Sequence, residues 1–402
     1  MLKLSKFLGA VLLVSGTSIG AAMLALPITT SFMGFVPSII LFVICWLCML
    51  CSGFFFAEIY CHFKKETNLV TMASQTLGKT GKLICWSFYL MLLYSLIAAY
   101  IAGSAPMFVG LFEEIGISIS LKAGYFCLPV LFGVFFCFGI KGIDLINRLL
   151  MVGLFISYFI ILFFTPSHMS IKNLSHFDIS LGWIAIPVVL TSFGFHIIIP
   201  SIGHYLNYDK KKLKKAIFLG SLLTLAVYLL WQILILGVVP LEGPISLASS
   251  WLKGDAVAPL AAFIGNPFIS AGAYSFAFFA IVTSFLGVAL ALSDFLVDGF
   301  KIKKTWEGHL LAYSLTFLPP IFFVLQFQRG FITALEYAGV FVAVLLGILP
   351  CLMLLKLKNN IQHNRKYRAE IFFVLAVSIF FLVASVLNNL GYFNYLMKKY
   401  IP

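Results

Sequence analysis

Two short stretches of this sequence combine hydroxyls, glycine and proline inside otherwise apolar segments. The first is GTSIGAAMLALP, Gly16 to Pro27, and the second is TSFGFHIIIP, Thr191 to Pro200. A helix at membrane depth satisfies its own backbone polar groups, so irregular backbone persists there only where it lines a cavity or meets other protein. Glycine permits the torsions that a break needs, and hydroxyls bond the carbonyls that a break frees. Both stretches therefore predict broken helices.

The first break has the chemistry of an anion site. Where a half-helix begins, its N–H groups and its dipole attract negative charge such as a carboxylate. The hydroxyls of Thr17 and Ser18 either contact the bound group or cap the break. The N–H groups expected to form the site belong to Ile19, Gly20, Ala21 and Ala22.

Helix packing is the alternative for the first stretch, because Gly16 and Gly20 have the GxxxG spacing of close helix contacts. The second stretch favours a site instead, since both stretches begin Thr-Ser-x-Gly and run on to a proline. Interruptions in matching positions of two halves point to the binding site of a transporter.

The composition is that of a polytopic membrane protein. Of 402 residues, 62% are hydrophobic and only 10% are charged, whereas soluble domains carry about 25% charged residues. The net charge of +13 is explained by basic cytoplasmic loops such as DKKKLKK at 209–215. We therefore expect the lipid bilayer, and no nucleic acid, as the partner.

Counting apolar runs of roughly 20 residues predicts about eleven spans. Of the 27 Lys and Arg residues, 21 fall on the side of the N-terminus when loops are assigned alternately. This asymmetry places the N-terminus in the cytoplasm, and an odd number of spans places the C-terminus outside. The predicted spans are 7–33, 36–60, 82–112, 123–141, 146–165, 180–204, 213–239, 267–298, 308–327, 331–355 and 370–392.

Each break begins a block of five spans. Because five is an odd number, the second block has the opposite orientation in the bilayer, so the two blocks form an inverted repeat. We predict an all-α fold with one transmembrane domain over residues 1–402. Its first repeat covers about 7–165, its second about 180–355, and an extra C-terminal helix about 370–392.

Four stretches of the sequence resemble the bacterial aromatic amino acid permeases, most closely the tyrosine-specific ones. They are GTSIGAAMLALP, IPVVLTSFGFHIIIPSI, TSFLGVALALSDFLVDGF and RGFITALEYAGV. The resemblance implies the amino acid–polyamine–organocation superfamily with its leucine-transporter-type fold and broken helices 1 and 6. It also implies a symporter of the bacterial cytoplasmic membrane that imports tyrosine with protons. Tryptophan or serine/threonine uptake and sodium coupling are the alternatives. This chain departs from the family's Gly-Ala-Gly-Met-Leu at Ala22, which places the carboxylate more on Gly20 and Ala21.

For the second break, the resemblance implies contacts with the rest of the substrate. Freed carbonyls near Thr191 and Ser192 would accept the ammonium group. Phe195 would stack on an aromatic ring. His196 would bond a phenol, carry a proton, or serve as a packing residue bonded to a carbonyl of helix one. The residues expected to line the pocket are Phe193, Gly194, Phe195 and His196.

Two further positions follow from the same resemblance. A tyrosine of the third span often reaches the carboxylate in this fold, and Tyr94 is preferred over Tyr100. Thr283 and Ser284 match a hydroxyl pair that binds Na⁺ in sodium-coupled relatives. The plain alternatives are a packed aromatic ring and hydroxyls that bond their own helix.

Acidic residues near the predicted membrane are assigned to the ends of spans. Glu58 is expected to pair at the inner end of its helix, and Glu336 to lie at an outer gate. Asp294 and Asp298 share one helix face near the cytoplasmic end, where we expect a cytoplasmic gate or an ion-pair network; a proton relay within the membrane is the alternative.

Other protein classes fit the sequence poorly. The motifs of a membrane enzyme are missing from it, so no catalytic residue and no cofactor beyond the coupling ion is expected. A channel needs a repeated filter or a charged ring. The CxxCxxC of residues 45–51 lies in an apolar run without other ligands, so no metal site is expected apart from Na⁺. No obligate protein partner is indicated.

Overall fold

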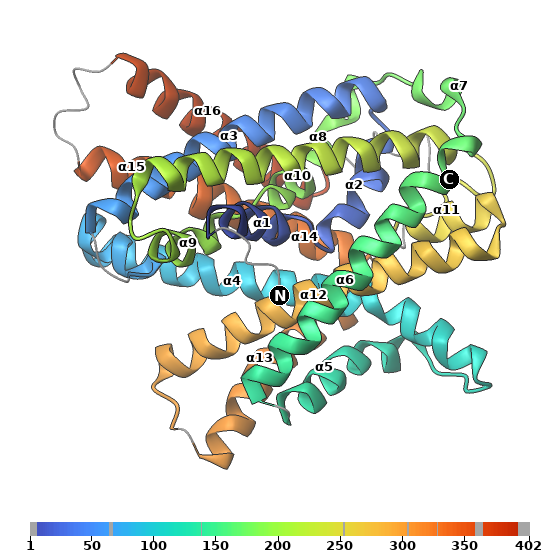
Figure 1. The fold of residues 1–402 in the computed structure, drawn as a ribbon, viewed down its shortest axis with the longest axis horizontal. Coiled ribbons are helices and arrows are strands. Elements are labelled where there is room, and N and C mark those ends of the chain that lie inside the picture. Colours follow the sequence, from blue (N-terminus) through green and yellow to red (C-terminus); the bar gives the residue numbers. More distant parts are fainter. Residues whose placement is uncertain are drawn as a thin grey trace.

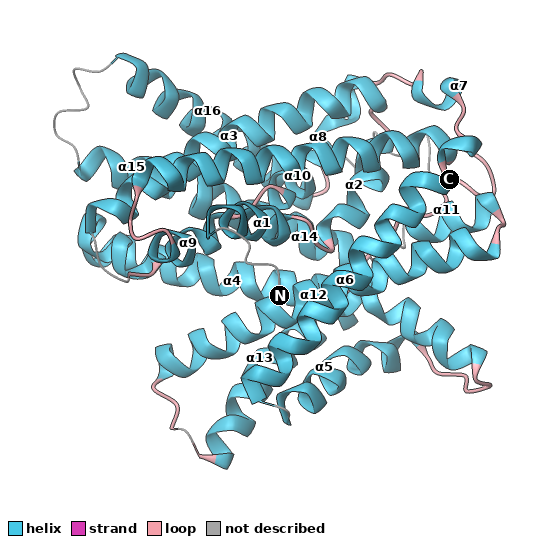
Figure 2. Ribbon diagram, in the orientation of Figure 1, coloured by secondary structure: helices cyan, strands magenta, loops and turns pink. Residues whose placement is uncertain are grey.

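The computed structural model describes residues 6–63, 67–137, 139–251, 254–303, 305–327, 329–357 and 365–392. Within these ranges the chain consists of helices and connecting loops, without a β-strand (Figure 2). The predicted all-α class is therefore confirmed. The helices of the first half are α1 (Lys6–Ser18), α2 (Ala22–Ser31), α3 (Phe35–Phe63), α4 (Leu69–Glu114), α5 (Leu121–Cys137) and α6 (Gly139–Phe164).

A short surface connection leads into the second half. It contains η1 (Pro166–His168), α7 (Ile171–Leu174) and η2 (Ile179–Leu181). The helices that follow are α8 (Gly182–Ser192), η3 (His196–Ile198), α9 (Ile199–Tyr205), α10 (Lys210–Val238), α11 (Val257–Ile264), α12 (Pro267–Phe300), α13 (Trp306–Gln326), α14 (Gly330–Val342), the π-helical η4 (Ala343–Ile348), α15 (Leu349–Leu357) and α16 (Arg365–Asn389).

Each of the eleven predicted spans coincides with a helix or with an interrupted helix. Nine helices in the described part are long and apolar enough to cross a membrane, and α1 with α2 makes a tenth as one bent span. The predicted fourth span corresponds to α5, which has 17 residues; residue 138 of that prediction lies outside the described residues.

Both predicted breaks are present. The first lies between α1 and α2, whose axes differ by 53°. The second lies between α8 and α9, where Phe193 to Phe195 leave the helix and η3 follows as a 3₁₀ turn. Phe193 has φ −95° and ψ 16°, and Phe195 has φ −99° and ψ −1°, which is the bridge region of backbone space.

The two broken helices lie inside a bundle of long helices (Figure 1). α1 packs on α10, and α10 in turn packs on α3. On the other side α4 packs against α12, α13 and α14, and α6 packs against α12. The breaks are thus enclosed by helices from both halves of the chain.

The connection predicted at 61–81 differs from the expectation, because helix α4 already begins at Leu69. The Asn68 side chain accepts a hydrogen bond from the Thr71 N–H at 2.8 Å and caps this early start. Gly78 then bends the helix, since its φ of 72° is outside the helical region.

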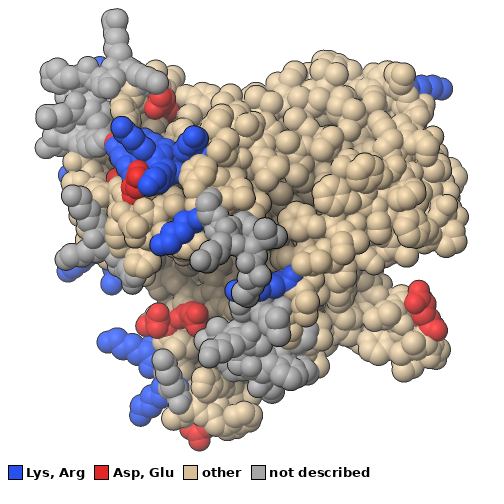
Figure 3. Space-filling model, in the orientation of Figure 1, with Lys and Arg blue, Asp and Glu red and all other residues tan. Residues whose placement is uncertain are grey.

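Basic side chains gather at one end of the molecule, seen at the left in Figure 3. There the buried Glu58 carboxylate accepts hydrogen bonds from Lys210 at 2.5 Å, Lys214 at 3.3 Å and the Tyr367 hydroxyl at 2.8 Å. The predicted pairing of Glu58 at its helix end is confirmed, and it joins α3, α10 and α16. The Asp209 side chain caps α10 by accepting a hydrogen bond from the Lys212 N–H, and this bond lowers the pKa of the Asp209 carboxyl below its usual range.

A second charged pair lies at the start of α14. Arg329 approaches Glu336 at 3.6 Å, and its guanidinium lies 3.9 Å from the centre of the Trp251 ring. The Trp251 ring meets Phe32, just after α2, edge to face at 5.2 Å. The role of Glu336 in an outer gate remains a prediction.

Candidate functional site

The two breaks face each other across one small cavity of about 80 Å³. Five of its lining residues come from the first break and three from the second, and α4, α12 and the α14–η4 segment complete the wall. The lining residues are Thr17, Ser18, Gly20, Ala21, Ala22, Thr191, Gly194, Ile197, Leu92, Leu96, Tyr100, Ser284, Val288, Val342 and Leu346.

At the first break, the backbone shows which N–H groups are already used. The N–H of Ile19 donates to Ser15 at 2.8 Å and so still belongs to α1. The N–H of Ala21 faces the Ser284 hydroxyl oxygen at 3.4 Å. The cavity is lined by Gly20, Ala21 and Ala22, whereas Ile19 does not reach it. Of the four residues predicted to form the anion site, these three lie at the cavity.

The hydroxyls of both Thr-Ser pairs bond their own helices. Thr17 donates to the Leu13 carbonyl at 2.7 Å, and Ser18 lies 3.5 Å from the Val14 carbonyl. At the second break, the hydroxyls of Thr191 and Ser192 each donate at 2.8 Å to carbonyls four residues earlier. The four residues thus finish α1 and α8 by local bonding, and Thr17, Ser18 and Thr191 also line the cavity.

The aromatic residues of the second break point away from the cavity. Phe193 packs on Phe42, with ring centres 6.3 Å apart. Phe195 covers Gly53, where an added Cβ would lie 2.8 Å from its ring. Only Gly194 of the four predicted lining residues reaches the cavity.

His196 lies behind this break, fully buried against aromatic rings. Its ring stacks on Phe195 at 4.8 Å and meets Phe56 edge to face at 6.2 Å. Neither ring nitrogen has a hydrogen-bond partner within the described residues. His196 therefore does not contact the cavity in this conformation.

The structure places Tyr100, rather than Tyr94, at the cavity. The Tyr94 hydroxyl donates to the Leu315 carbonyl of α13 at 2.9 Å and lies outside the lining. Tyr100 is buried and lines the cavity together with Ser284. Six positions along a helix change the face, so only one of the two tyrosines can reach the break.

Of the hydroxyl pair Thr283 and Ser284 on α12, likewise only one member reaches the cavity. Thr283 donates to the Phe279 carbonyl of its own helix at 2.7 Å. Ser284 points at the first break, and a Cβ added to Gly20 would overlap its hydroxyl oxygen. Of the predicted ion ligands, Ser284 alone lines the cavity.

Tyr228 is a contact that the sequence analysis missed. Its hydroxyl reaches the carbonyls of Ser18 and Ser192, the last residues of α1 and α8. Its neighbours on the same face of α10, Trp231 and Gln232, also donate to polar atoms of other helices. The detectable signal was this set of polar side chains at spacings of three and four inside an apolar helix.

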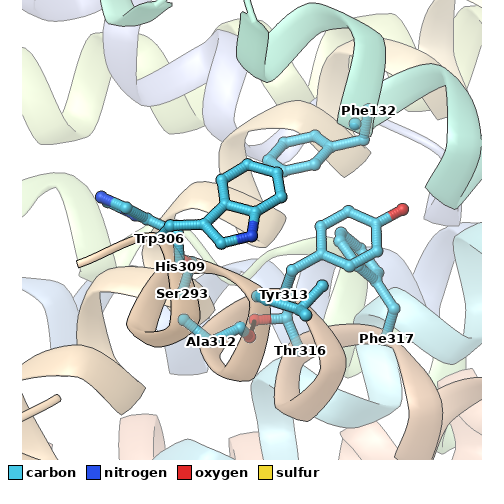
Figure 4. A pocket seen from close by; sticks show the side chains of 10 residues that line it. Phe132, Ser293, Trp306, His309, Ala312, Tyr313, Thr316 and Phe317 are labelled. Carbon is cyan, nitrogen blue, oxygen red and sulfur yellow. Dashed lines mark hydrogen bonds between the residues drawn. The ribbon is translucent and has the colours of Figure 1, made fainter. Parts of the chain in front are cut away.

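A second cavity of about 180 Å³ lies between α5, α12 and α13. Its wall contains Phe132 and Tyr313, whose rings lie 5.3 Å and 4.8 Å from that of Phe317. The exposed Trp306 lies beside this aromatic group (Figure 4). No residue of either break lines this cavity, so the smaller one is the candidate functional site.

Comparison with known proteins agrees with this architecture. The fold resembles that of a mutant of the manganese transporter of Eremococcus coleocola, with a TM-score of 0.61, 16% identity, and coverage of 95% of this chain and 87% of that one. This likeness supports the transporter fold.

Sequence relatives are more specific. The tyrosine-specific transport systems 2 and 1 of Haemophilus influenzae are 35% and 34% identical to this chain, over 87% and 89% of both chains in each pair. The tryptophan-specific transport protein of the same organism is 31% identical, over 97% of this chain and 98% of its own length. The model of the tryptophan/tyrosine permease family matches residues 3–389. The chain therefore belongs to the tryptophan/tyrosine permease family.

Proposed function

We propose that this permease imports an aromatic amino acid through the cavity between its two broken helices, and that tyrosine is the first candidate substrate. The observation that carries the proposal is that both breaks line the same cavity. The start of α2 offers N–H groups to a carboxylate, and the end of α8 offers carbonyls to an ammonium group. The apolar wall suits a ring; it consists of Leu92, Leu96, Val288, Val342 and Leu346.

The size of the cavity requires a conformational change during transport. Pockets that bind small molecules usually measure roughly 300–1,000 Å³, so a cavity of about 80 Å³ is small for a whole aromatic amino acid. The walls must separate for the substrate to enter, which is the requirement of alternating access. The phenylalanines of the second break would reach the substrate only through such a rearrangement.

Tryptophan is the second candidate substrate. The tryptophan-specific relative matches almost the full length of this chain, while the tyrosine-specific relatives have slightly higher identity. Competition between the two amino acids distinguishes these candidates.

For coupling, we propose protons, with Na⁺ at Ser284 as the alternative. For orientation, we propose a cytoplasmic N-terminus and an external C-terminus in the bacterial cytoplasmic membrane. The basic end of the molecule (Figure 3) supports the orientation, because cytoplasmic loops collect Lys and Arg. Residues 1–5 and 393–402, which carry the two termini, lie outside the described residues.

The deciding experiment is uptake of labelled tyrosine into proteoliposomes that contain the purified protein. We expect accumulation under an inward proton gradient, and inhibition by unlabelled tyrosine in excess. Accumulation only under a sodium gradient would show that Na⁺, and not the proton, is the coupling ion. Inhibition by tryptophan or serine but not by tyrosine would overturn the proposed substrate.

Tyr100→Phe is expected to reduce tyrosine uptake about tenfold, which is the cost of one buried hydrogen bond of roughly 1.4 kcal/mol. The matched control is Tyr94→Phe, which removes the same hydroxyl from the same helix but away from the cavity. Initial rates at a series of tyrosine concentrations measure both variants. Equal losses in the two variants would contradict a role for Tyr100 at the site.

Ser284→Ala is expected to impair uptake several-fold, whereas Thr283→Ala leaves it near the wild-type rate. The Ser284 hydroxyl contacts the break, while that of Thr283 bonds its own helix. The ion dependence of Ser284→Ala is measured by repeating uptake at several Na⁺ concentrations. A larger effect of Thr283→Ala would contradict the assignment.

A further inference from the structure

Tyr228 contacts the ends of both interrupted helices at once. It lies on α10 and is fully buried. Its hydroxyl oxygen is 2.5 Å from the carbonyl oxygen of Ser18 and 2.8 Å from that of Ser192. Ser18 is the last residue of α1, and Ser192 is the last residue of α8. One side chain from a third helix thus brings the two C-terminal ends together.

This arrangement has two acceptors for one proton. A phenol carries a single O–H, so Tyr228 can donate fully to only one of the two carbonyls. Both carbonyls belong to helix C-termini, where the dipoles place partial negative charge. A second donor with positive charge is therefore favoured at this point.

An amino acid brings such a donor. Its ammonium group carries three protons and a full charge, and hydrogen bonds to charged groups are about twice as strong as neutral ones. Ser18 lines the cavity, and Ser192 directly follows Thr191, which also lines it. Tyr228 itself lies outside the lining, so its contact with the two carbonyls adjoins the cavity wall.

We propose that Tyr228 is a positioning residue for the ammonium group of the substrate. Its hydroxyl holds the Ser18 and Ser192 carbonyls close together, and the ammonium group supplies the proton that the phenol lacks. This assignment rests on the proposed function, because it requires an amino acid in the cavity.

The rest of α10 keeps the helices together without Tyr228. Trp231 donates to the Met23 carbonyl at 3.1 Å, and Gln232 donates to the Thr30 hydroxyl at 2.6 Å. Both contacts join α10 to α2, on the far side of the first break. Loss of the Tyr228 hydroxyl is therefore expected to alter the spacing of the two carbonyls while the fold persists.

Tyr158 provides a matched control. It is a buried tyrosine of α6 whose hydroxyl donates to the carbonyl of Val227 at 3.2 Å, one residue from Tyr228. Tyr158→Phe removes a phenol hydroxyl that joins α6 to α10, and this hydroxyl does not touch either break. A general loss of packing or hydrogen bonding would affect both variants alike.

The experiment compares two ligands by calorimetry on the purified proteins. They are tyrosine and 3-(4-hydroxyphenyl)propionate, which lacks only the amine. Tyr228→Phe is expected to weaken tyrosine binding about tenfold, corresponding to roughly 1.4 kcal/mol, and binding of the amine-free ligand less than twofold. The preference for the amine therefore falls in Tyr228→Phe and is unchanged in Tyr158→Phe.

The outcomes separate the two proposals. A wild-type preference for the amine in Tyr228→Phe, or equal weakening of both ligands, would overturn the role of Tyr228 alone. If the wild-type protein binds no aromatic amino acid, the proposed function fails, and the ammonium assignment fails with it. Should Tyr228→Phe not fold, Tyr228→His returns an N–H donor at this position and is expected to keep the preference for the amine; equal weakening of both ligands in that variant would overturn the role.

Discussion

Replacing Gly20 with leucine is expected to abolish tyrosine uptake while the protein remains folded in the membrane. Gly20 lies in the break between α1 and α2, and even a Cβ at this position would overlap the Ser284 hydroxyl oxygen. A leucine side chain would also fill much of a cavity of only about 80 Å³ and block the N–H groups at the start of α2. Uptake into proteoliposomes, normalised to the reconstituted protein, measures the effect.

Alanine at the same position separates blocking from misfolding. In Gly20→Ala the Ser284 hydroxyl can rotate aside, at the cost of its contact with the Ala21 N–H, so we expect a partial loss of about tenfold, the size of one hydrogen bond. Gly16→Ala is the matched control, since a Cβ there meets only the Met151 methyl at an ordinary 3.7 Å. Normal uptake by Gly20→Leu would contradict the assignment of this break to the substrate.

The breaks could be predicted from the sequence because their causes are local. Glycine, proline and paired hydroxyls inside an apolar segment are visible without knowledge of any neighbour. The same holds for the spans, since an apolar run of roughly 20 residues has few alternatives in a membrane. The early start of α4 at Leu69 was missed because the capping residue, Asn68, lies outside the apolar pattern.

The direction of side chains at the second break could not be predicted in this way. The chain leaves the helix at Phe193 to Phe195, so the 3.6-residue period no longer predicts which way these side chains face. Their rings, with that of His196, pack towards α3. Tyr228 was missed for another reason. Its partners are 210 and 36 positions away in the chain, and only the fold brings them together.

Gly339→Leu is expected to cause the largest loss of stability. Gly339 lies on α14 where this helix crosses α8, and a Cβ there would come within 2.6 Å of the Cα and carbonyl oxygen of Pro187. These are backbone atoms, which cannot rotate aside, and close approach through small residues is how helices associate in membranes. We expect a loss of about 3 kcal/mol, the upper part of the usual range for overpacked cores. The midpoint of aggregation on heating, followed by size-exclusion chromatography in detergent, measures it.

The same contact connects stability to the site. Thr191 lies four residues after Pro187 and one residue before the end of α8 at the second break, and its hydroxyl lies 3.4 Å from the Leu335 carbonyl of α14. Displacing α14 should therefore move this break as well as loosen the bundle. Gly287→Leu is the matched control, since no atom lies within 4 Å of a Cβ at that position of α12, and leucine favours a helix over glycine. If the two variants aggregate at the same temperature, α14 and α8 do not depend on this close approach.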